Sequence, residues 1–224
     1  MKIIVVAPPG PQAEFRVKFT APHEYFFAET FAAMESHLAS SDVVFDFLPA
    51  PRNGYLAYYE RPHLAVFCET TFVSLADLVH AHGGREPQAQ LFGFCGLPTL
   101  LNRPVLEASL WRPTDQTSLA SVCNQLVTEF AVVADRVGLV TPRVLSLLIN
   151  EAFYTLQEGT ANLADIDLSL KLGTNYPHGP FEWAARLGIA TVYQILNAVY
   201  EDSRDERYRI CPLLKRAYLT NRLP

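Results

Sequence analysis

The segment from Gly138 to Trp183 is the feature of this sequence that most constrains its fold. Apolar side chains recur in it at spacings of three and four residues, and Gly159 follows them. This spacing places them on one face of a helix, and glycine readily adopts the left-handed conformation that ends a helix. The stripe consists of Leu145, Leu148, Ile149, Ala152 and Leu156. The segment therefore predicts a long amphipathic helix packed against other helices.

Two further helices are predicted directly after the first. Asn162 is suited to cap the second helix, and Asp165 and Asp167 stand in its first two turns, where the helix dipole favours acids. Gly173 is expected to end this helix. A turn rich in proline then leads to a third helix, with Pro180 in its first turn. The pattern predicts an all-helical, closely packed unit.

Several short motifs occur in a fixed order from Gly138 to the last residues. They are LINEA, the EG after the long helix, ADID, LKLG, NYPHGPFEWA, and DERYR followed by PLL. In order and spacing this region resembles the C-terminal helical domain of the 3-hydroxyacyl-CoA dehydrogenase family. The resemblance implies an all-α dimerisation domain over 138–224. It also implies a homodimer through these helices, since two such domains pack together in the family.

Composition and charge limit the classes of protein to which the chain can belong. Of 224 residues, 50% are hydrophobic and 18% charged, with a formal net charge of -5, which excludes a disordered chain and gives no basic footprint for nucleic acid. No apolar run approaches the roughly 18 residues that a membrane helix needs. The four cysteines form no C-x-x-C pair and no export signal precedes them, so we expect them to be reduced and buried in a cytoplasmic protein.

The N-terminal run Lys2 to Ala7 is typical of a buried strand in an α/β sheet. In a dinucleotide-binding fold, G-x-G-x-x-G should follow it and open a helix. The chain has only Gly10 there, and three prolines surround it, which removes the backbone N–H groups that would bind a phosphate. The alternation from Phe15 to Phe19 predicts a strand in place of that helix. NAD is therefore implied by the family resemblance alone.

The next strand, Asp42 to Leu48, resembles the fourth strand of the family, which reads D-L-V-I-E-A-V-P. Asp46 then stands at the family's glutamate and Pro49 at its proline. Only about 35 residues separate this strand from the first one, too few for the family's second and third strands with their helices. The resemblance implies that two features are lost: a helical hairpin that helps hold coenzyme A, and the acidic residue that binds the adenine ribose.

After a strand predicted from His63 to Phe67, the sequence CETTFVSL stands where the family has S-N-T-S-S-L, which contributes a hydroxyl to the substrate. Thr70 and Thr71 remain as candidate hydroxyls, whereas Phe72 replaces the second serine. A helix capped by Ser74 is predicted to follow.

The segment GFCGLPTLLNRPVLE, from Gly93 to Glu107, aligns without a gap with the family's G-M-H-F-F-N-P-V-P-V-M-K-L-V-E. Cys95 occupies the place of the catalytic histidine, the general base, and Pro98 that of an asparagine beside it. Glu107 matches the glutamate that orients the histidine. A cysteine has a reference pKa about two units higher than histidine, and a nearby carboxylate raises it further. We therefore predict that the general base is absent.

A further family asparagine, which stabilises the substrate carbonyl oxygen, is replaced by Pro142 in the first turn of the long helix. Before it, a helix from Thr117 to Thr128 and a buried strand from Phe130 to Ala134 complete the first domain. We predict a shortened, doubly wound, Rossmann-like α/β domain over 1–137, followed by the all-α domain.

Three functions remain open at this stage. The first is a family homologue without hydride transfer, a pseudoenzyme that acts as a binding or scaffolding homodimer and has an acyl-CoA as a possible ligand. The second is an active NAD-dependent 3-hydroxyacyl-CoA dehydrogenase of fatty-acid metabolism. The third is different chemistry in the remodelled cleft through Cys95 and Glu107. Loss of the cofactor site together with the base favours the first.

Each candidate residue also has a structural interpretation. Glu107 can pair with a nearby arginine, and Cys95 can serve as a small hydrophobic residue. His178 can be an exposed turn residue. Gly173 and Gly179 are expected to meet backbone requirements. For Glu182 and Trp183, which follow the proline-rich turn, a role in packing is favoured.

Overall fold

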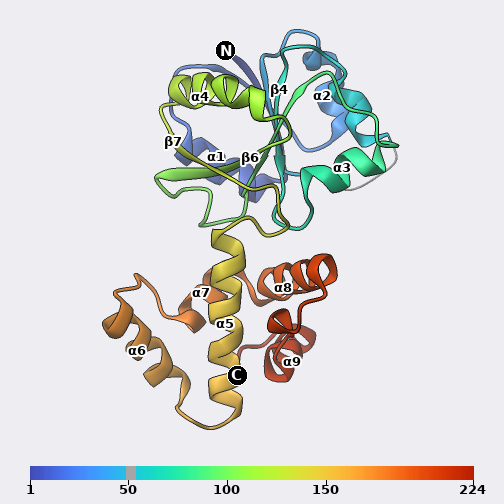
Figure 1. The fold of residues 1–224 in the computed structure, drawn as a ribbon. Helices are drawn as coiled ribbons and strands as arrows, with labels where there is room; N and C mark the ends of the chain where they lie inside the picture. The colour runs from blue at the N-terminus through green and yellow to red at the C-terminus, as the bar shows by residue number, and fades with distance from the viewer. Residues whose placement is uncertain (49–53) are drawn as a thin grey trace. The chain divides into compact units, whose positions relative to one another are not determined.

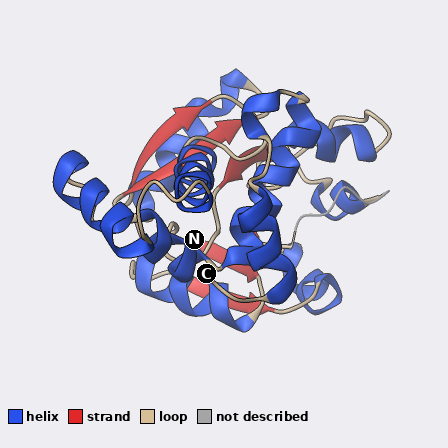
Figure 2. Cartoon of the chain, turned by 90° about the horizontal axis from the view of Figure 1, so that it is seen from below, coloured by secondary structure: helices blue, strands red, loops and turns tan. Residues whose placement is uncertain are grey.

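The computed structural model describes residues 1–48 and 54–224, so Pro49, aligned above with the family's proline, lies outside the described residues. The described chain divides into two units, Met1–Leu139 and Val140–Pro224 (Figure 1). Each unit has its own secondary structure: the strands, drawn red in Figure 2, belong to the first unit, and the second unit is built from helices.

The first unit is built on a seven-stranded sheet in the order β2-β1-β3-β4-β5-β6-β7. Every neighbouring pair is parallel except β5 and β6, which are antiparallel. The strands are β1 (Lys2–Val6), β2 (Glu24–Ala28), β3 (Val43–Asp46), β4 (Ala65–Glu69), β5 (Gln90–Phe94), β6 (Val105–Leu110) and β7 (Glu129–Val133). The prediction of an α/β domain with a reduced Rossmann-like sheet is confirmed.

Helices cover both faces of this sheet, because its central strands are apolar on both sides. Phe15 of α1 and Leu119 of α4 belong to the hydrophobic cluster on one face. Met34 of α2 and Leu78 of α3 belong to the cluster on the other face, together with a short 3-10 helix, η1. Figure 1 shows the two pairs of helices on opposite sides of the strands. The elements are α1 (Pro9–Lys18), α2 (Phe31–Leu38), η1 (Tyr55–Tyr59), α3 (Leu75–Ala81), η2 (Pro113–Asp115) and α4 (Gln116–Gln125).

The strand predicted from Phe15 to Phe19 is wrong, since Phe15 lies inside α1 and Phe19 is its C-cap. The two rings are four residues apart and contact each other on one side of the helix, with centroids separated by 4.6 Å. Pro9 and Pro11 do not prevent the helix, because proline is tolerated in a first turn where no amide has an intrahelical partner.

The predicted loss of both strands between β1 and β3 is also wrong. Strand β2 pairs in parallel with β1 over its whole length, with Lys2 opposite Glu24, and helix α2 follows it. One strand–helix unit is therefore retained in this stretch. The strand predicted as buried near Phe130 is β7, but its side chains are largely exposed and Val132 is 41% exposed. Among the described strands β7 pairs with β6 alone, so it is an edge strand.

The second unit is organised around α5, which packs against each of the four other helices. The buried face of α5 carries Leu145, Ile149, Ala152 and Phe153. The predicted long helix and its end are confirmed, since Gly159 follows α5 with a φ of 72°. The elements are α5 (Thr141–Gln157), α6 (Leu163–Thr174), α7 (Pro180–Leu187), α8 (Ile189–Ser203), η3 (Glu206–Tyr208) and α9 (Pro212–Thr220). The all-helical prediction is confirmed.

Asn150 explains part of the LINEA motif. This buried side chain donates to the carbonyl of Arg209 at 2.9 Å and accepts from the amide of Cys211, also at 2.9 Å. Two turns further along α5, the side-chain oxygen of Gln157 accepts from the amide of Leu213 at 3.0 Å. The polar residues of α5 thus hold the beginning of α9, because they satisfy backbone groups that have no helical partner.

Helix α6 begins as predicted, since the side-chain oxygen of Asn162 accepts from the amide of Asp165 at 3.0 Å. The predicted end at Gly173 is wrong. Gly173 lies inside the helix, and Asn175 ends it with a φ of 56°. Asparagine tolerates the left-handed conformation better than most residues because its short side chain can hydrogen-bond locally.

Candidate functional site

The carboxyl end of β1 is the place where a dinucleotide-binding fold would hold a pyrophosphate. Helix α1 starts there at Pro9, after Pro8 as its N-cap. Pro9 and Pro11 have no N–H, and the amide of Gln12 donates to the carbonyl of Pro8 at 3.2 Å. The first three residues of α1 therefore offer one amide to an anion, that of Gly10. Three residues other than proline would offer three amides there.

The side chain of Gln12 bridges the ends of two strands at this point. Its amide nitrogen donates to the carbonyl of Ala7, after β1, at 2.7 Å and to the carbonyl of Ala28, the last residue of β2, at 3.4 Å. One polar side chain thus donates hydrogen bonds to the carbonyls at the ends of two neighbouring strands. This contact ties α1 to the carboxyl ends of β1 and β2.

Glu29 directly follows β2, and its side chain is exposed. In dinucleotide-binding folds an acidic residue at this place, about 20 residues after the glycine motif, binds the adenine ribose. The prediction that this acid is lost is therefore wrong, because β2 itself is retained. The sequence signal that could have found it is the acid after the aromatic run EYFFA.

Asp46 ends β3 and is completely buried. Its carboxylate accepts hydrogen bonds from the hydroxyl of Tyr59 at 2.7 Å, from the hydroxyl of Tyr55, and from the amide of Leu48 at 2.8 Å. Burial and the nearby Asp46 charge raise the pKa of both tyrosines well above its usual value. The residue aligned with the family's glutamate is therefore enclosed by hydrogen-bond donors from η1.

Thr70 and Thr71 follow β4 and are both completely buried. A β-carbon at Gly93 would lie 2.5 Å from the hydroxyl oxygen of Thr70 and 2.3 Å from that of Ser109. Gly93 thus leaves room for two hydroxyls packed between strands. The Thr70 hydroxyl is buried beside Gly93 and has no hydrogen-bond partner among the described residues.

Glu69, the last residue of β4, has a carboxyl group in contact with Thr71, and no role was predicted for it. It is 5% exposed, and one carboxyl oxygen accepts from the amide of Thr71 at 3.1 Å. Burial raises the pKa of Glu69 to about 7, although hydrogen bonds from Thr71 oppose the rise. A carboxyl at the end of the run LAVFCE is the available sequence signal.

Cys95 directly follows β5 and is 2% exposed. Burial raises the pKa of its thiol to about 12, and the nearby Glu69 contributes in the same direction. The β5–β6 register, with Phe94 opposite Ala108, brings Cys95 to the end of the ladder that also carries Glu107. At neutral pH a thiol with this pKa is protonated, so it can act neither as a base nor as a nucleophile without ionisation.

Glu107 lies on β6, is buried, and forms an ion pair with the guanidinium of Arg103 at 3.0 Å. A buried carboxylate needs such a partner, since an unpaired charge there would be costly. Pro98 is exposed, and Pro142 is buried in the first turn of α5. Neither proline side chain can donate the hydrogen bond of the family's asparagine.

The remaining residues of interest, His178, Glu182 and Trp183, lie in the second unit. The ring nitrogen Nδ1 of His178 lies 3.6 Å from the carboxylate of Glu182, which also binds the ammonium of Lys171 at 2.6 Å. The ring of Trp183 meets that of His178 edge-on, with centroids separated by 4.9 Å. These contacts join α6 and α7.

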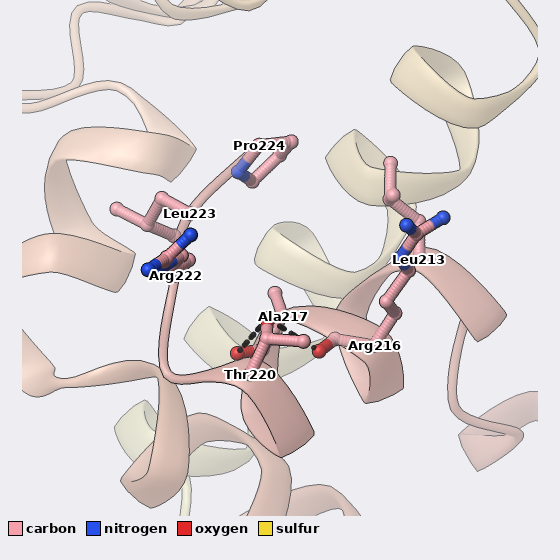
Figure 3. A pocket seen from close by; sticks show the side chains of 7 residues that line it. All are labelled: Leu213, Arg216, Ala217, Thr220, Arg222, Leu223 and Pro224. Atoms are coloured by element: carbon pink, nitrogen blue, oxygen red, sulfur yellow. Dashed lines mark hydrogen bonds between the residues drawn. The ribbon is translucent and has the colours of Figure 1, made fainter.

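An open hollow of about 650 Å³ lies beside α9 in the second unit (Figure 3). No predicted site residue lines it. Its lining consists of Leu213, Arg216, Ala217, Thr220, Arg222, Leu223 and Pro224. Within residues 1–48 and 54–224, no cluster of three potential metal ligands occurs. The described helices also include none with both the length and the apolar character to cross a bilayer.

Comparison with known proteins places these observations in a family. The family model of the 3-hydroxyacyl-CoA dehydrogenase C-terminal domain matches residues 138–224. A 3-hydroxybutyryl-CoA dehydrogenase from Bradyrhizobium diazoefficiens is 41% identical over 160 residues, which are 69% of this chain and 53% of that protein. The 3-hydroxyadipyl-CoA dehydrogenase of Escherichia coli K12 is 40% identical over 87 residues, which are 39% of this chain and 18% of that protein.

The alignments thus span about half of the first of these relatives and less of the second. Among solved structures, the (S)-3-hydroxybutyryl-CoA dehydrogenase of Ralstonia eutropha has a similar fold, with a TM-score of 0.71 at 21% identity. That alignment covers 88% of this chain and 71% of the other. The motifs of the helical unit, the sheet order and these similarities lead to one conclusion. The chain belongs to the 3-hydroxyacyl-CoA dehydrogenase family.

Proposed function

We propose that this protein is a family member without hydride-transfer activity, which acts as a binding or scaffolding homodimer. The observation that carries the proposal is the first turn of α1, where Gly10 supplies the one amide available to a phosphate. A dinucleotide pyrophosphate depends on several such amides and on the helix dipole. Cofactor affinity is therefore expected to be weak even though the fold is retained.

The state of the residue in the histidine's place supports the same proposal. A general base needs a pKa near the operating pH and must reach the proton that it removes. Cys95 meets neither requirement, since it is buried with a pKa of about 12. An active enzyme would need other residues to bind the cofactor and also another group to remove the proton. Compensation for both losses is harder than compensation for one substitution.

An active NAD-dependent 3-hydroxyacyl-CoA dehydrogenase is the second candidate. Glu29 at the end of β2 favours it, because an exposed acid there can bind the ribose hydroxyls of a dinucleotide. The names of the relatives favour it as well. Chemistry through Cys95 and Glu107 is less well supported, because the thiol is protonated and the carboxylate is held by Arg103.

Calorimetric titration with NADH, followed by an assay with acetoacetyl-CoA and NADH, tests the proposal. We expect no saturable NADH binding in the micromolar range and no oxidation of NADH. Saturable binding together with turnover would establish the active dehydrogenase instead. Binding of acetoacetyl-CoA without NADH would identify the acyl thioester as the ligand of a non-catalytic protein. We also propose a cytoplasmic location, which the four unpaired, buried cysteines support.

A further inference from the structure

Strand β2 forms the edge of the sheet opposite to β7, because among the described strands it pairs with β1 alone. The amide of Glu24 donates to the carbonyl of Met1 at 3.1 Å, so Glu24 and every second residue after it direct their backbone groups toward β1. The backbone groups of the residues between them, Tyr25 and Phe27, point away from β1. The N–H and C=O groups of these two residues are therefore open to a further strand.

The side chains of the same two residues line a hollow beside this edge. Its volume is about 220 Å³, and its walls are the rings of Phe15, Phe19, Tyr25 and Phe27 with the side chain of Arg16. Phe15 and Phe19 are buried, whereas Tyr25 and Phe27 are partly buried. One large apolar side chain from a neighbouring strand would fill a hollow of this size.

Positive charge lies beside these aromatic rings. The guanidinium carbon of Arg16 lies 3.4 Å from the ring centroid of Phe27, and Nζ of Lys18 lies 5.9 Å from that of Phe19. Arg16 is exposed and forms no salt bridge within residues 1–48 and 54–224. Glu24, the acid of β2, lies on the other face because side chains alternate along a strand. An acid on an incoming strand would find a free guanidinium here.

The charge at this edge favours another chain over a second copy of this one. If two β2 strands paired in antiparallel fashion, both α1 helices would lie on the same face of the joined sheet. The two Arg16 guanidiniums would then share that face without an acid from either strand, and like charges across an interface are unfavourable. Edge strands often carry a lysine or proline that prevents pairing, and β2 has neither.

We propose that β2 binds an extended acidic peptide segment of another protein as an additional strand of the sheet. The backbone of the segment pairs with Tyr25 and Phe27, and an aromatic or aliphatic side chain enters the hollow. An acid two residues away, on the same face of the segment, binds Arg16. In this mode of recognition the backbone ladder gives affinity and the pockets for alternate side chains give specificity. The surface includes neither Cys95 nor Glu107, so the proposal does not depend on whether hydride transfer is lost.

A fluorescein-labelled peptide with the core Phe-Val-Asp between threonines is the probe, because its first and third core side chains share one face of a strand. Fluorescence anisotropy with the full chain is expected to show saturable binding. Arg16→Glu should weaken this binding by roughly tenfold or more, and it should bind the matched Phe-Val-Lys peptide better than the wild-type protein does. Arg186→Glu makes the same charge change at an exposed position of α7 and should leave both affinities unchanged.

Amide hydrogen exchange, followed by NMR, identifies the paired edge directly. With saturating Phe-Val-Asp peptide, the amides of Tyr25 and Phe27 are expected to exchange at least about tenfold more slowly, because they gain hydrogen bonds. Those of Glu24 and Phe26 already face β1 and should not change. Of two peptides that are methylated on alternate amide nitrogens, one should bind and the other should not, since only every second amide of a paired strand faces its neighbour.

Four results would overturn the proposal. They are the absence of saturable binding up to about 1 mM peptide, equal binding by Arg16→Glu and its control, equal binding of the two methylated peptides, and protection that arises away from β2. Protection of Tyr25 and Phe27 that needs no peptide and increases with protein concentration would also overturn it, and would assign the edge to a second copy of this chain.

Discussion

The carboxylate of Asp167 occupies the space that a side chain at Gly179 would need. A β-carbon at Gly179 would lie 2.3 Å from Cγ of Asp167. The carboxylate accepts hydrogen bonds from the amides of Phe181 at 2.8 Å and Glu182 at 3.1 Å, the first amides of α7. A residue of α6 thus caps α7, and the absence of a side chain in the turn before α7 makes this contact possible.

Gly179→Ala is therefore expected to lower the free energy of unfolding by about 1–3 kcal/mol, as overpacking does in a well-packed site. The added methyl must displace the Asp167 carboxylate from the amides that it caps. Gly173→Ala is the matched control. Gly173 lies inside α6 with nothing within 4 Å of an added β-carbon. Alanine there should be neutral or stabilise by up to about 1 kcal/mol. Urea unfolding of both variants measures the difference, and equal effects would contradict this account.

These two glycines also show how far the sequence predicts the second unit. The apolar stripe of α5 and the cap at Asn162 were predicted because they depend on local spacing and chemistry alone. Gly173 was assigned to a helix end by its residue type, although Asn175 carries the left-handed φ of 56°. Asp167 looked like a dipole-favoured acid, but it caps a different helix, which only the tertiary structure reveals.

The candidate site also has features that the sequence predicts and others that only the tertiary structure reveals. Cys95, Glu107, Thr70 and Thr71 could be named because a family motif aligns with them. The burial of Cys95 was expected, as for the other cysteines, but that of Glu107, Thr70 and Thr71 could not be predicted, since it depends on strands far apart in the sequence. Asp46 could be aligned with the family's glutamate, but its two tyrosine partners could not be named because η1 packs them against β3 from a separate segment. The alternation from Phe15 to Phe19 does not distinguish a strand from helix α1, because two phenylalanines four residues apart also lie on one side of a helix.

Tyr59→Phe tests the buried carboxylate at the end of β3. The variant removes a hydroxyl that donates to Asp46 at 2.7 Å in a completely buried place. The free energy of unfolding should fall by about 1–3 kcal/mol, because a buried acceptor loses a donor that water cannot replace. Tyr58→Phe is the control, as Tyr58 is 39% exposed on the same 3-10 helix. It should change stability by less than about 0.5 kcal/mol. A similar loss in both variants would show that the hydroxyl of Tyr59 has no special role.

Thiol labelling tests the state of Cys95. All four cysteines are free and buried, and the Cys95 pKa of about 12 leaves almost no thiolate at neutral pH. Native protein at pH 7.5 is expected to react with a disulfide reagent at least about a hundredfold more slowly than glutathione does, because both access and ionisation are restricted. Protein in urea should react at all four positions and serves as the control. Rapid labelling of native protein that is lost in Cys95→Ser would restore the thiol as a candidate nucleophile.

Glu69 makes stability depend on pH in a direction opposite to that of a salt-bridged acid. Its pKa in the folded protein is about 7, raised from 4.5 chiefly by burial, so the folded state keeps a proton that the unfolded state releases. This contribution to stability is complete below pH 4.5 and is lost as pH rises to 7. The loss is on the order of 3 kcal/mol, since each pH unit over which one proton differs contributes about 1.4 kcal/mol. Glu69→Gln cannot titrate but keeps an acceptor for the amide of Thr71. We expect the wild-type protein to lose stability relative to this variant between pH 4.5 and 7, and the difference to be constant above pH 8. Urea unfolding of both proteins across this range measures it, and parallel curves would show that Glu69 is not protonated in the folded state.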